Sequence, residues 1–369
     1  MPKSHLYFPE LDSLRFLAFL AVFIHHAPFA GFIEGWETLH RYGWIGVDVF
    51  LCLSAFLFAK ILFAEHTQKG GINVRYFYLR RLLRIWPLYF AFLAAMLTYQ
   101  LIAFGWNGGI SPRLLGSLTF TDNIFSAFLG YNAAIPYFAH LWTISYEEQV
   151  YLFIPWILAF FYRREKRVAL LYIGIAALIG SCLRAALVYA EADYLTVWTL
   201  PITHFESVLG GLGVGLGLFD KPLQKIPAWI QLAGGLVMLY FVTTLPNVTR
   251  LGWESMLTYP LVGAGVSLVL SAVSTRRLGL VSNMMESKSL GYLGKISYGL
   301  YVYHILALEA VKKLTEIYIP PERELLFPIA VLAAGLVVTV ATSALSYEAL
   351  EKPFQRMKAR FTLIENRAT

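Results

Sequence analysis

Three ionisable residues interrupt the apolar run RFLAFLAVFIHHAPF at residues 15–29, and two of them share a helical face. Arg15 and His26 are eleven residues apart, which at roughly 100° per residue is about 20° beyond three full turns. They would lie about 16 Å apart along the axis, whereas His25 points about 80° away from His26. An imidazole titrates near neutral pH and can act as a general base. The pattern predicts acid–base chemistry at His26, with Arg15 on the same stripe.

A structural interpretation stands beside this one. A histidine on an apolar helix can be satisfied by a carbonyl group of a neighbouring helix, and His25, which leaves the Arg15 face, favours that interpretation. An ionisable residue inside a membrane is nevertheless a candidate functional residue, because its exposure to lipid is costly.

The stretch HLWTISYEEQVYLFIP (140–155) carries two adjacent carboxylates into an apolar segment. Glu147 and Tyr151 are one helical turn apart on the same face, and Glu148 turns away. We expect a functional role for at least one of the two carboxylates.

A second polar face occurs in GKISYGLYVYHILALE (294–309). Ser297, Tyr301 and His304 recur there at i, i+4 and i+7, which places them on one side of a helix. Helix packing or an aromatic belt at the membrane interface explains the tyrosines equally well.

The stretch THFESVLGGLGVGLG (203–217) combines polar and small residues. Two small-xxx-small pairs, Gly211/Gly215 and Gly213/Gly217, are expected to allow helices to approach closely. Glu206 and His204 are weaker candidates for a site.

Four arginines gather in NVRYFYLRRLLRIWPLYF (73–90). They are Arg75, Arg80, Arg81 and Arg84. Arginines at the cytoplasmic end of a span set its topology and contact lipid phosphates. They could also clamp a phosphorylated cytosolic ligand, because guanidinium groups bind phosphate through paired hydrogen bonds.

The elements that would position these residues are membrane-spanning helices. Hydrophobic residues form 58% of the chain and charged residues 14%, and the mean hydropathy is +0.60, whereas soluble domains have about 25% charged residues. An all-α polytopic membrane protein with a bundle of about ten transmembrane helices is therefore expected. The predicted spans are 11–31, 43–64, 84–104, 141–162, 168–190, 199–219, 227–245, 256–272, 293–314 and 325–347.

The distribution of basic residues predicts an orientation. With the N-terminus in the cytoplasm, 21 of the 30 Lys and Arg residues fall on the inner side and six on the outer side. This bias follows the positive-inside rule and predicts a multi-pass plasma (inner) membrane protein with both termini cytoplasmic. The net charge of +7 therefore reflects topology, and we expect no nucleic-acid partner. Cys52 and Cys182 fall in predicted spans and indicate neither a disulfide framework nor a metal site.

One membrane-embedded domain is expected over residues 1–369. The longest segment between spans, 105–140, is predicted to face outward. Its aromatic content is too high for a free linker, so we expect it to fold back onto the helices and line an outer cavity.

Six blocks of the sequence, in order, resemble the acyltransferase 3 family of integral membrane acyltransferases. LDSLRFLAFLAVFIHH is similar to the family pattern LDGLRxxA…H, and GWIGVDVFLCLSAFLF to GVDLFFVLSGFLI, with Ser13 and Ala55 in place of glycines. The other four blocks are FYLRRLLRIWPLYF, HLWTISYEEQVYLFIP, LGKISYGLYVYH and SYEALEKPF. Together they cover residues 11 to 354, and the first selects His26 by its spacing from Arg15.

The resemblance implies a ten-helix bundle that transfers an acyl group, commonly acetyl, from cytosolic acyl-CoA (acetyl-CoA) without a metal. It implies His26 as catalytic histidine, with Arg15 and Glu147 beside it. Arg80, Arg81 and Arg84, with Arg75, would bind the donor. Supporting residues would be Asp12, His25, Tyr151, Ser297, Tyr301 and His304. The extracytoplasmic domain fused to some members is not expected.

The acceptor implied is a sugar hydroxyl of a cell-surface or lipid-linked glycan of the cell envelope, such as lipopolysaccharide or exopolysaccharide. His26 would act as general base or would carry the acyl group itself, and Glu147 would orient the imidazole. Two other functions remain open: a secondary transporter, and a non-catalytic subunit of a glycan-export assembly.

Overall fold

The computed structural model describes residues 7–28, 36–131, 134–274, 278–320 and 326–364, and all regular secondary structure in these ranges is helical. A helix satisfies its own backbone hydrogen bonds, which is what an apolar segment requires in a bilayer interior. The predicted all-α class is confirmed for the described residues.

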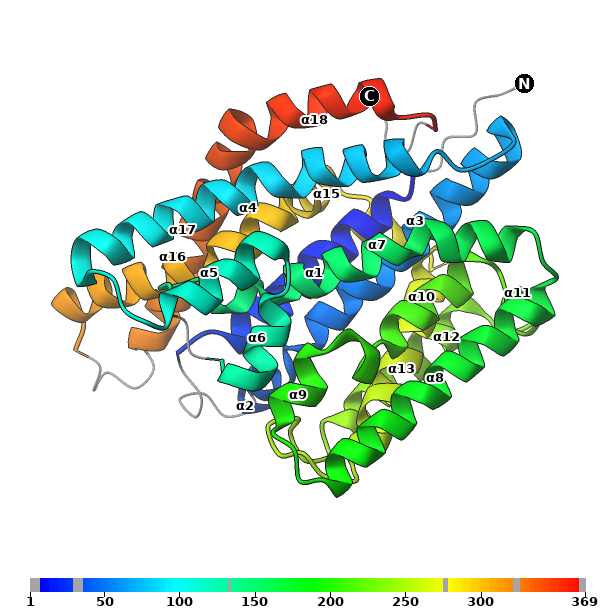
Figure 1. Cartoon of the computed structure of the whole chain (residues 1–369), viewed down its shortest axis with the longest axis horizontal. Coiled ribbons are helices and arrows are strands. Elements are labelled where there is room, and N and C mark those ends of the chain that lie inside the picture. Colours follow the sequence, from blue (N-terminus) through cyan, green and yellow to red (C-terminus); the bar gives the residue numbers. More distant parts are fainter. Residues whose placement is uncertain (1–6, 29–35, 132–133, 275–277, 321–325, 365–369) are drawn as a thin grey trace.

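The helices of at least 15 residues form the body of the bundle (Figure 1). They are α1 (Pro9–His25), α3 (Ile45–Lys69), α4 (Val74–Phe104), α7 (Trp142–Tyr162), α8 (Lys166–Tyr189), α12 (Ala228–Val242), α13 (Ser255–Ser274), α16 (Ser297–Tyr318) and α17 (Leu326–Ser346). The shorter α-helices are α2 (Trp36–Tyr42), α5 (Ile110–Thr119), α6 (Asp122–Leu129), α9 (Tyr194–Thr199), α10 (Glu206–Gly215), α11 (Asp220–Leu223), α14 (Leu280–Met285), α15 (Lys288–Lys295) and α18 (Lys352–Lys358). Single turns occur at η1 (Ala139–Leu141), η2 (Pro201–Thr203), η4 (Ala359–Phe361) and, as π-helix, η3 (Tyr347–Glu351).

Five helical stretches of the described residues are long and apolar enough to cross a bilayer. They are α3, α4, α8, α13 and the continuous stretch Leu326–Phe361, which begins with α17. In α8 only 22% of the most apolar window is buried within the protein, so most of its apolar surface faces outward, as a hydrocarbon environment favours. These helices support the prediction of a membrane protein, and the count of ten spans stays a prediction.

The prediction of one continuous span over 199–219 is wrong. Leu200, just before Pro201, is extended, because proline disfavours a helical conformation in the residue that precedes it. After the single turn η2, the chain becomes α-helical again only at Glu206, and α10 has ten residues, about 15 Å long. That is roughly half of a hydrocarbon core about 30 Å thick.

The segment 105–140 folds onto the bundle through buried polar contacts. Arg113 of α5 pairs with Asp122 of α6 at 3.0 Å, and both side chains are buried. Asn123 donates a hydrogen bond to the carbonyl oxygen of Thr199 and accepts one from Gln149 of α7. The fold-back agrees with that part of the expectation, whereas the outer cavity and the outward position of this segment stay predictions.

Close helix packing brings distant segments to one place. Helix α10 crosses α3 at Gly211. A Cβ atom at this position would lie 2.2 Å from the carbonyl oxygen of Cys52, so no larger residue fits. This confirms the close approach predicted from Gly211 and Gly215. The second predicted pair is not a helix contact, because Gly217 lies beyond the end of α10 and Gly213 lies against Phe219. On the other side α1 packs against α15 and α16, and α18 (red) lies along α4 (cyan) in Figure 1.

Candidate active site

A cavity lies among α1, α3, α4, α7 and α16, with about 1160 Å³ of space free of protein atoms when the open solvent at its edge is included. Part of its wall is apolar and includes Val47, Phe50 and Leu57 of α3. The predicted site residues that line it are Asp12, Arg15, Arg81, Arg84, Glu147, Tyr151, Ser297 and Tyr301. Residues of five of the six sequence blocks, including the apolar wall from α3, therefore converge on one space.

Arg15 is held at the cavity by its own helix. Its Nη1 lies 2.5 Å from Oδ1 of Asp12, one turn earlier in α1, and the side chains are only 11% and 9% exposed. The ion pair fixes the direction of the guanidinium group, because both partners belong to the same rigid helix.

Arg81 lines the cavity without an ion pair to any described residue, and Glu148 is near enough to interact with it electrostatically. Its guanidinium carbon lies 4.7 Å from the centre of the Phe58 ring, a favourable cation–π distance. Among the described residues it makes no hydrogen bond or ion pair, and its Nε is buried without a partner. A positive group held in this way inside a cavity is suited to bind an anion.

Arg80 points away from the cavity, because consecutive helical residues differ by about 100° in direction. It forms an ion pair with Glu65 of α3 at 3.2 Å and donates to the carbonyl oxygen of Phe361 at 2.8 Å. Arg75 is exposed near the start of α4. Neither Arg75 nor Arg80 lines the cavity.

Glu147 faces the cavity from α7. It accepts a hydrogen bond from the Tyr151 hydroxyl at 2.7 Å, and that hydroxyl lies 3.3 Å from Oγ of Ser54. Arg84 is among the arginines near enough to interact with the carboxylate electrostatically. Within the described structure Glu147 hydrogen-bonds Tyr151 and does not contact the His26 imidazole.

Tyr301 and Thr143 stand at one boundary of the cavity. The Tyr301 hydroxyl lies 2.7 Å from Oγ1 of Thr143 and donates to the carbonyl oxygen of His140 at 3.0 Å. Oγ1 of Thr143 lies 3.1 Å from the same carbonyl oxygen, and its one proton is shared between that oxygen and the Tyr301 hydroxyl. These hydrogen bonds join α16 to the first turn of α7.

A group of histidines lies beyond that boundary. His304 Nε2 is 3.1 Å from Nδ1 of His26, and the His140 ring centre is 4.9 Å from that of His304 and 6.4 Å from that of His26. His26 itself does not line the cavity. In the described part of the chain, no group of three or more His, Cys, Asp or Glu side chains could hold a metal ion.

His25 turns toward α2. Its Nδ1 lies 2.6 Å from the carbonyl oxygen of His40, whose own Nε2 lies 2.9 Å from the carbonyl oxygen of Ala27. These contacts tie the end of α1 to α2 and favour the structural interpretation of His25.

Sequence reasoning did not single out His140 and Thr143, or Ser54 and Phe58 on α3. His140 and Thr143 lie three residues apart in the same stretch as Glu147, so a face analysis begun at residue 140 could have found them. Nothing in the local sequence marks Ser54 or Phe58, because their role depends on which helix lies opposite.

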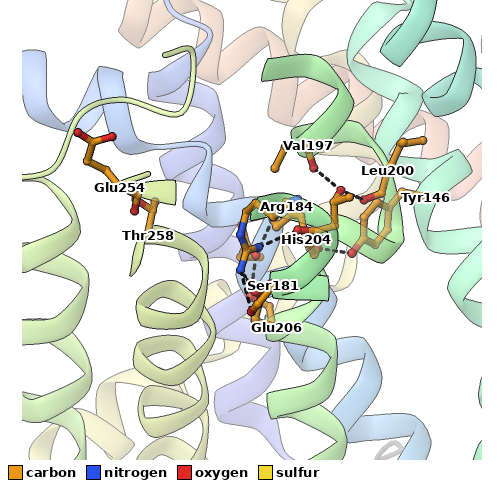
Figure 2. Close-up of polar contacts among 12 residues, drawn as sticks. Tyr146, Ser181, Arg184, Val197, Leu200, His204, Glu206, Glu254 and Thr258 are labelled. Atoms are coloured by element: carbon orange, nitrogen blue, oxygen red, sulfur yellow. Dashed lines mark hydrogen bonds and ion pairs between the residues drawn. The ribbon is translucent and has the colours of Figure 1, made fainter. Parts of the chain in front are cut away.

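A second polar cluster is buried away from the cavity (Figure 2). Arg184 Nη2 lies 2.5 Å from Oε1 of Glu206, and His204 Nε2 lies 3.2 Å from Oδ1 of Asp48. The Tyr146 hydroxyl donates to the carbonyl oxygen of His204 at 2.5 Å. None of these five residues lines the cavity. The cluster joins α3, α7 and α8 to the broken segment before α10, and we interpret it as structural.

Comparison with known proteins gives a consistent family match. A family model described as an acyltransferase domain matches residues 8–348. Two relatives are the O-acetyltransferases OatA of Staphylococcus aureus strains NCTC 8325 / PS 47 and COL, each 25% identical over 382 residues. The match covers 96% of this chain and 58% of each relative, so the chain spans little more than half of their length. No solved structure matches.

Proposed function

Because the chain belongs to the acyltransferase 3 family, we propose that it transfers an acyl group from acyl-CoA to a hydroxyl group of a sugar. The proposed acceptor is a cell-surface or lipid-linked glycan, and the proposed location is the plasma membrane with both termini in the cytoplasm. The name of the OatA relatives supports acetyl as the group and oxygen as the acceptor atom.

The observation that carries the proposal is the cavity itself. It combines the unpaired guanidinium of Arg81 with Arg15 and Arg84, and with an apolar wall from α3. Phosphate groups are bound well by guanidinium groups, and an extended pantetheine arm suits a partly apolar passage. We assign Arg15, Arg81 and Arg84 to the donor, whereas Arg80 would hold α4 to α3.

His26 is the proposed base. Its nitrogen takes the proton of the acceptor hydroxyl as the hydroxyl oxygen attacks the thioester carbonyl carbon. A carbon–oxygen bond forms, the carbon–sulfur bond breaks, and the departing thiolate takes the proton from the imidazole. The products are the ester and free CoA. In an alternative mechanism, His26 first accepts the acyl group and then passes it to the hydroxyl group, and the products are the same.

This scheme requires the thioester to pass the hydrogen-bonded pair of Tyr301 and Thr143, which lies between the cavity and the histidines. We propose that the pair separates when the donor is bound. Glu147, placed in the cavity beside Tyr151, would act on the donor side and not on the imidazole.

The test is transfer of labelled acetyl from acetyl-CoA by the purified protein, together with mass spectrometry of envelope glycans with and without the protein. We expect transfer by the wild-type chain and a loss of at least about 100-fold in His26→Ala, the usual scale for a general base. Wild-type turnover in a folded His26→Ala protein would overturn the mechanism. Coupled solute uptake without CoA dependence would support a transporter instead.

A further inference from the structure

Three groups form a hydrogen-bonded line from α16 to the end of α1. The carbonyl oxygen of Tyr301 lies 2.6 Å from Nδ1 of His304, and Nε2 of His304 lies 3.1 Å from Nδ1 of His26. That same Nδ1 of His26 lies 3.0 Å from the carbonyl oxygen of Val22. His304 is completely buried, so its ring cannot exchange these partners for bulk water.

The two carbonyl oxygens determine where the protons lie, because a carbonyl oxygen can only accept. The contact with Tyr301 requires hydrogen on Nδ1 of His304, which leaves a lone pair on Nε2 of the neutral ring. The contact with Val22 requires hydrogen on Nδ1 of His26. In the opposite tautomer, Nδ1 of His26 would carry a lone pair. That lone pair would face both the carbonyl oxygen of Val22 and the lone pair on Nε2 of His304, and both contacts would be repulsive.

We propose that His304 is a positioning residue for His26. It accepts the Nδ1–H of His26, and this bond holds the ring in the tautomer whose Nε2 carries a free lone pair. In the described structure Nε2 of His26 has no hydrogen-bond partner, so it is the nitrogen available to an acceptor hydroxyl. The catalytic role given to this bond rests on the proposed function, whereas the tautomer of His26 does not depend on it.

The same bond acts during transfer. When Nε2 of His26 takes the proton of the hydroxyl group, the ring becomes positive and its Nδ1–H bond to His304 becomes charge-assisted. Such bonds are roughly twice as strong as neutral ones. His304 thereby stabilises the charged ring through a neutral lone pair, a task that a carboxylate performs in serine hydrolases.

The first test needs no substrate. The full chain is labelled with ¹⁵N in its histidine rings, and its spectrum is recorded at about pH 8, above the usual titration range of histidine. Comparison with His26→Gln identifies the His26 signals. We expect hydrogen on Nδ1 and none on Nε2, and hydrogen on Nε2 of His26 would overturn the inference. This result is independent of whether the protein transfers acyl groups.

The second test compares two substitutions of His304 in the transfer assay. His304→Phe keeps a flat ring without an acceptor, whereas His304→Gln offers a side-chain oxygen that can accept from His26. We expect kcat to fall about 10- to 100-fold in His304→Phe, with the donor KM unchanged and part of the rate restored in His304→Gln. Equal loss in both variants, or none in His304→Phe, would overturn the inference.

His140→Phe provides the matched control for the spectrum. Its ring lies beside both other histidines, but its Nε2 contacts the carbonyl oxygen of Tyr301 and not His26. We expect its substitution to leave the His26 tautomer as it is. If a His304 variant does not fold, hydrogen on Nε2 of His26 in the wild-type spectrum would still overturn the inference.

Discussion

Arg81 lies over the ring of Phe58 at 4.7 Å, while the preceding residue, Arg80, is locked in an ion pair with Glu65. Two adjacent arginines of one helix therefore have opposite surroundings. Arg81 has no hydrogen bond or ion pair among the described residues, whereas the charge of Arg80 holds α4 to α3.

Arg81→Met should weaken binding of acetyl-CoA about 10- to 100-fold, because it removes charge-assisted bonds worth roughly 1.5–3 kcal/mol and keeps the aliphatic length. Titration calorimetry on the purified protein measures this. Arg80→Met is the matched control. It should lower the unfolding temperature, because the buried Glu65 loses its partner at a cost of about 3–5 kcal/mol, and it should leave the donor affinity unchanged. A donor-binding defect confined to Arg80→Met would contradict the assignment.

Gly294→Ala should disturb the start of α1. A Cβ atom at Gly294 would lie 1.9 Å from the carbonyl oxygen of Asp12, so α15 and α1 would have to separate and Arg15 would shift with its helix. We expect a lower unfolding temperature and a higher donor KM. Gly291→Ala, in the same helix with nothing within 4 Å of the new Cβ, should be neutral or stabilising by roughly 0.5–1 kcal/mol. Equal effects of both substitutions would argue against the close approach.

Tyr301→Ala should allow the donor to react without an acceptor. The substitution removes the hydroxyl that bridges Thr143 and the carbonyl of His140, and water could then reach a bound thioester. A thiol reagent measures free CoA in the absence of acceptor, and we expect its release to rise relative to transfer. Tyr298→Ala is the control, since Tyr298 also lines the cavity but donates to the carbonyl of Ile85. An unchanged ratio in Tyr301→Ala would show that the pair is not a boundary.

Asp122 should give the protein a distinctive pH dependence. Burial raises the pKa of this carboxyl group to about 6, although Arg113 acts in the opposite direction. The folded chain then binds more protons than the unfolded chain between about pH 4 and 6, so this contribution to stability is present at low pH and is lost as pH rises through 6. A shift of about two pKa units corresponds to roughly 3 kcal/mol.

The measurement is the difference in unfolding temperature between the wild type and Asp122→Asn across this range. As pH rises through about 6, the unfolding temperature of the wild type should fall relative to that of Asp122→Asn. The variant has no carboxyl group at residue 122, so any pH dependence of the difference comes from the wild-type carboxyl group. A difference that does not vary with pH would contradict the raised pKa.

The composition of the cavity was predictable from the sequence because charge within apolar helices must be housed away from lipid. Arg15, Arg81, Arg84 and Glu147 each interrupt an apolar segment, and all four line one cavity. The sequence motifs gathered these four residues, but together with Arg75, Arg80 and His26, which do not line the cavity.

The sequence could not distinguish Arg80 from Arg81, because the direction of a side chain has meaning only when the neighbouring helix is known. The contact between His26 and His304 spans 278 residues, and no local pattern predicts it. The break before α10 did have a signal, Pro201, but hydropathy averaged over a long window conceals a single proline.

The hydrogen bond between Tyr301 and Thr143 has a further consequence for a protein that holds a polar cavity inside a membrane. A continuous wet passage from one face to the other would let protons leak and dissipate the gradient on which the cell depends. We expect the closed pair to separate the cavity from the histidines, and so to keep the bilayer insulated between cycles of the proposed reaction.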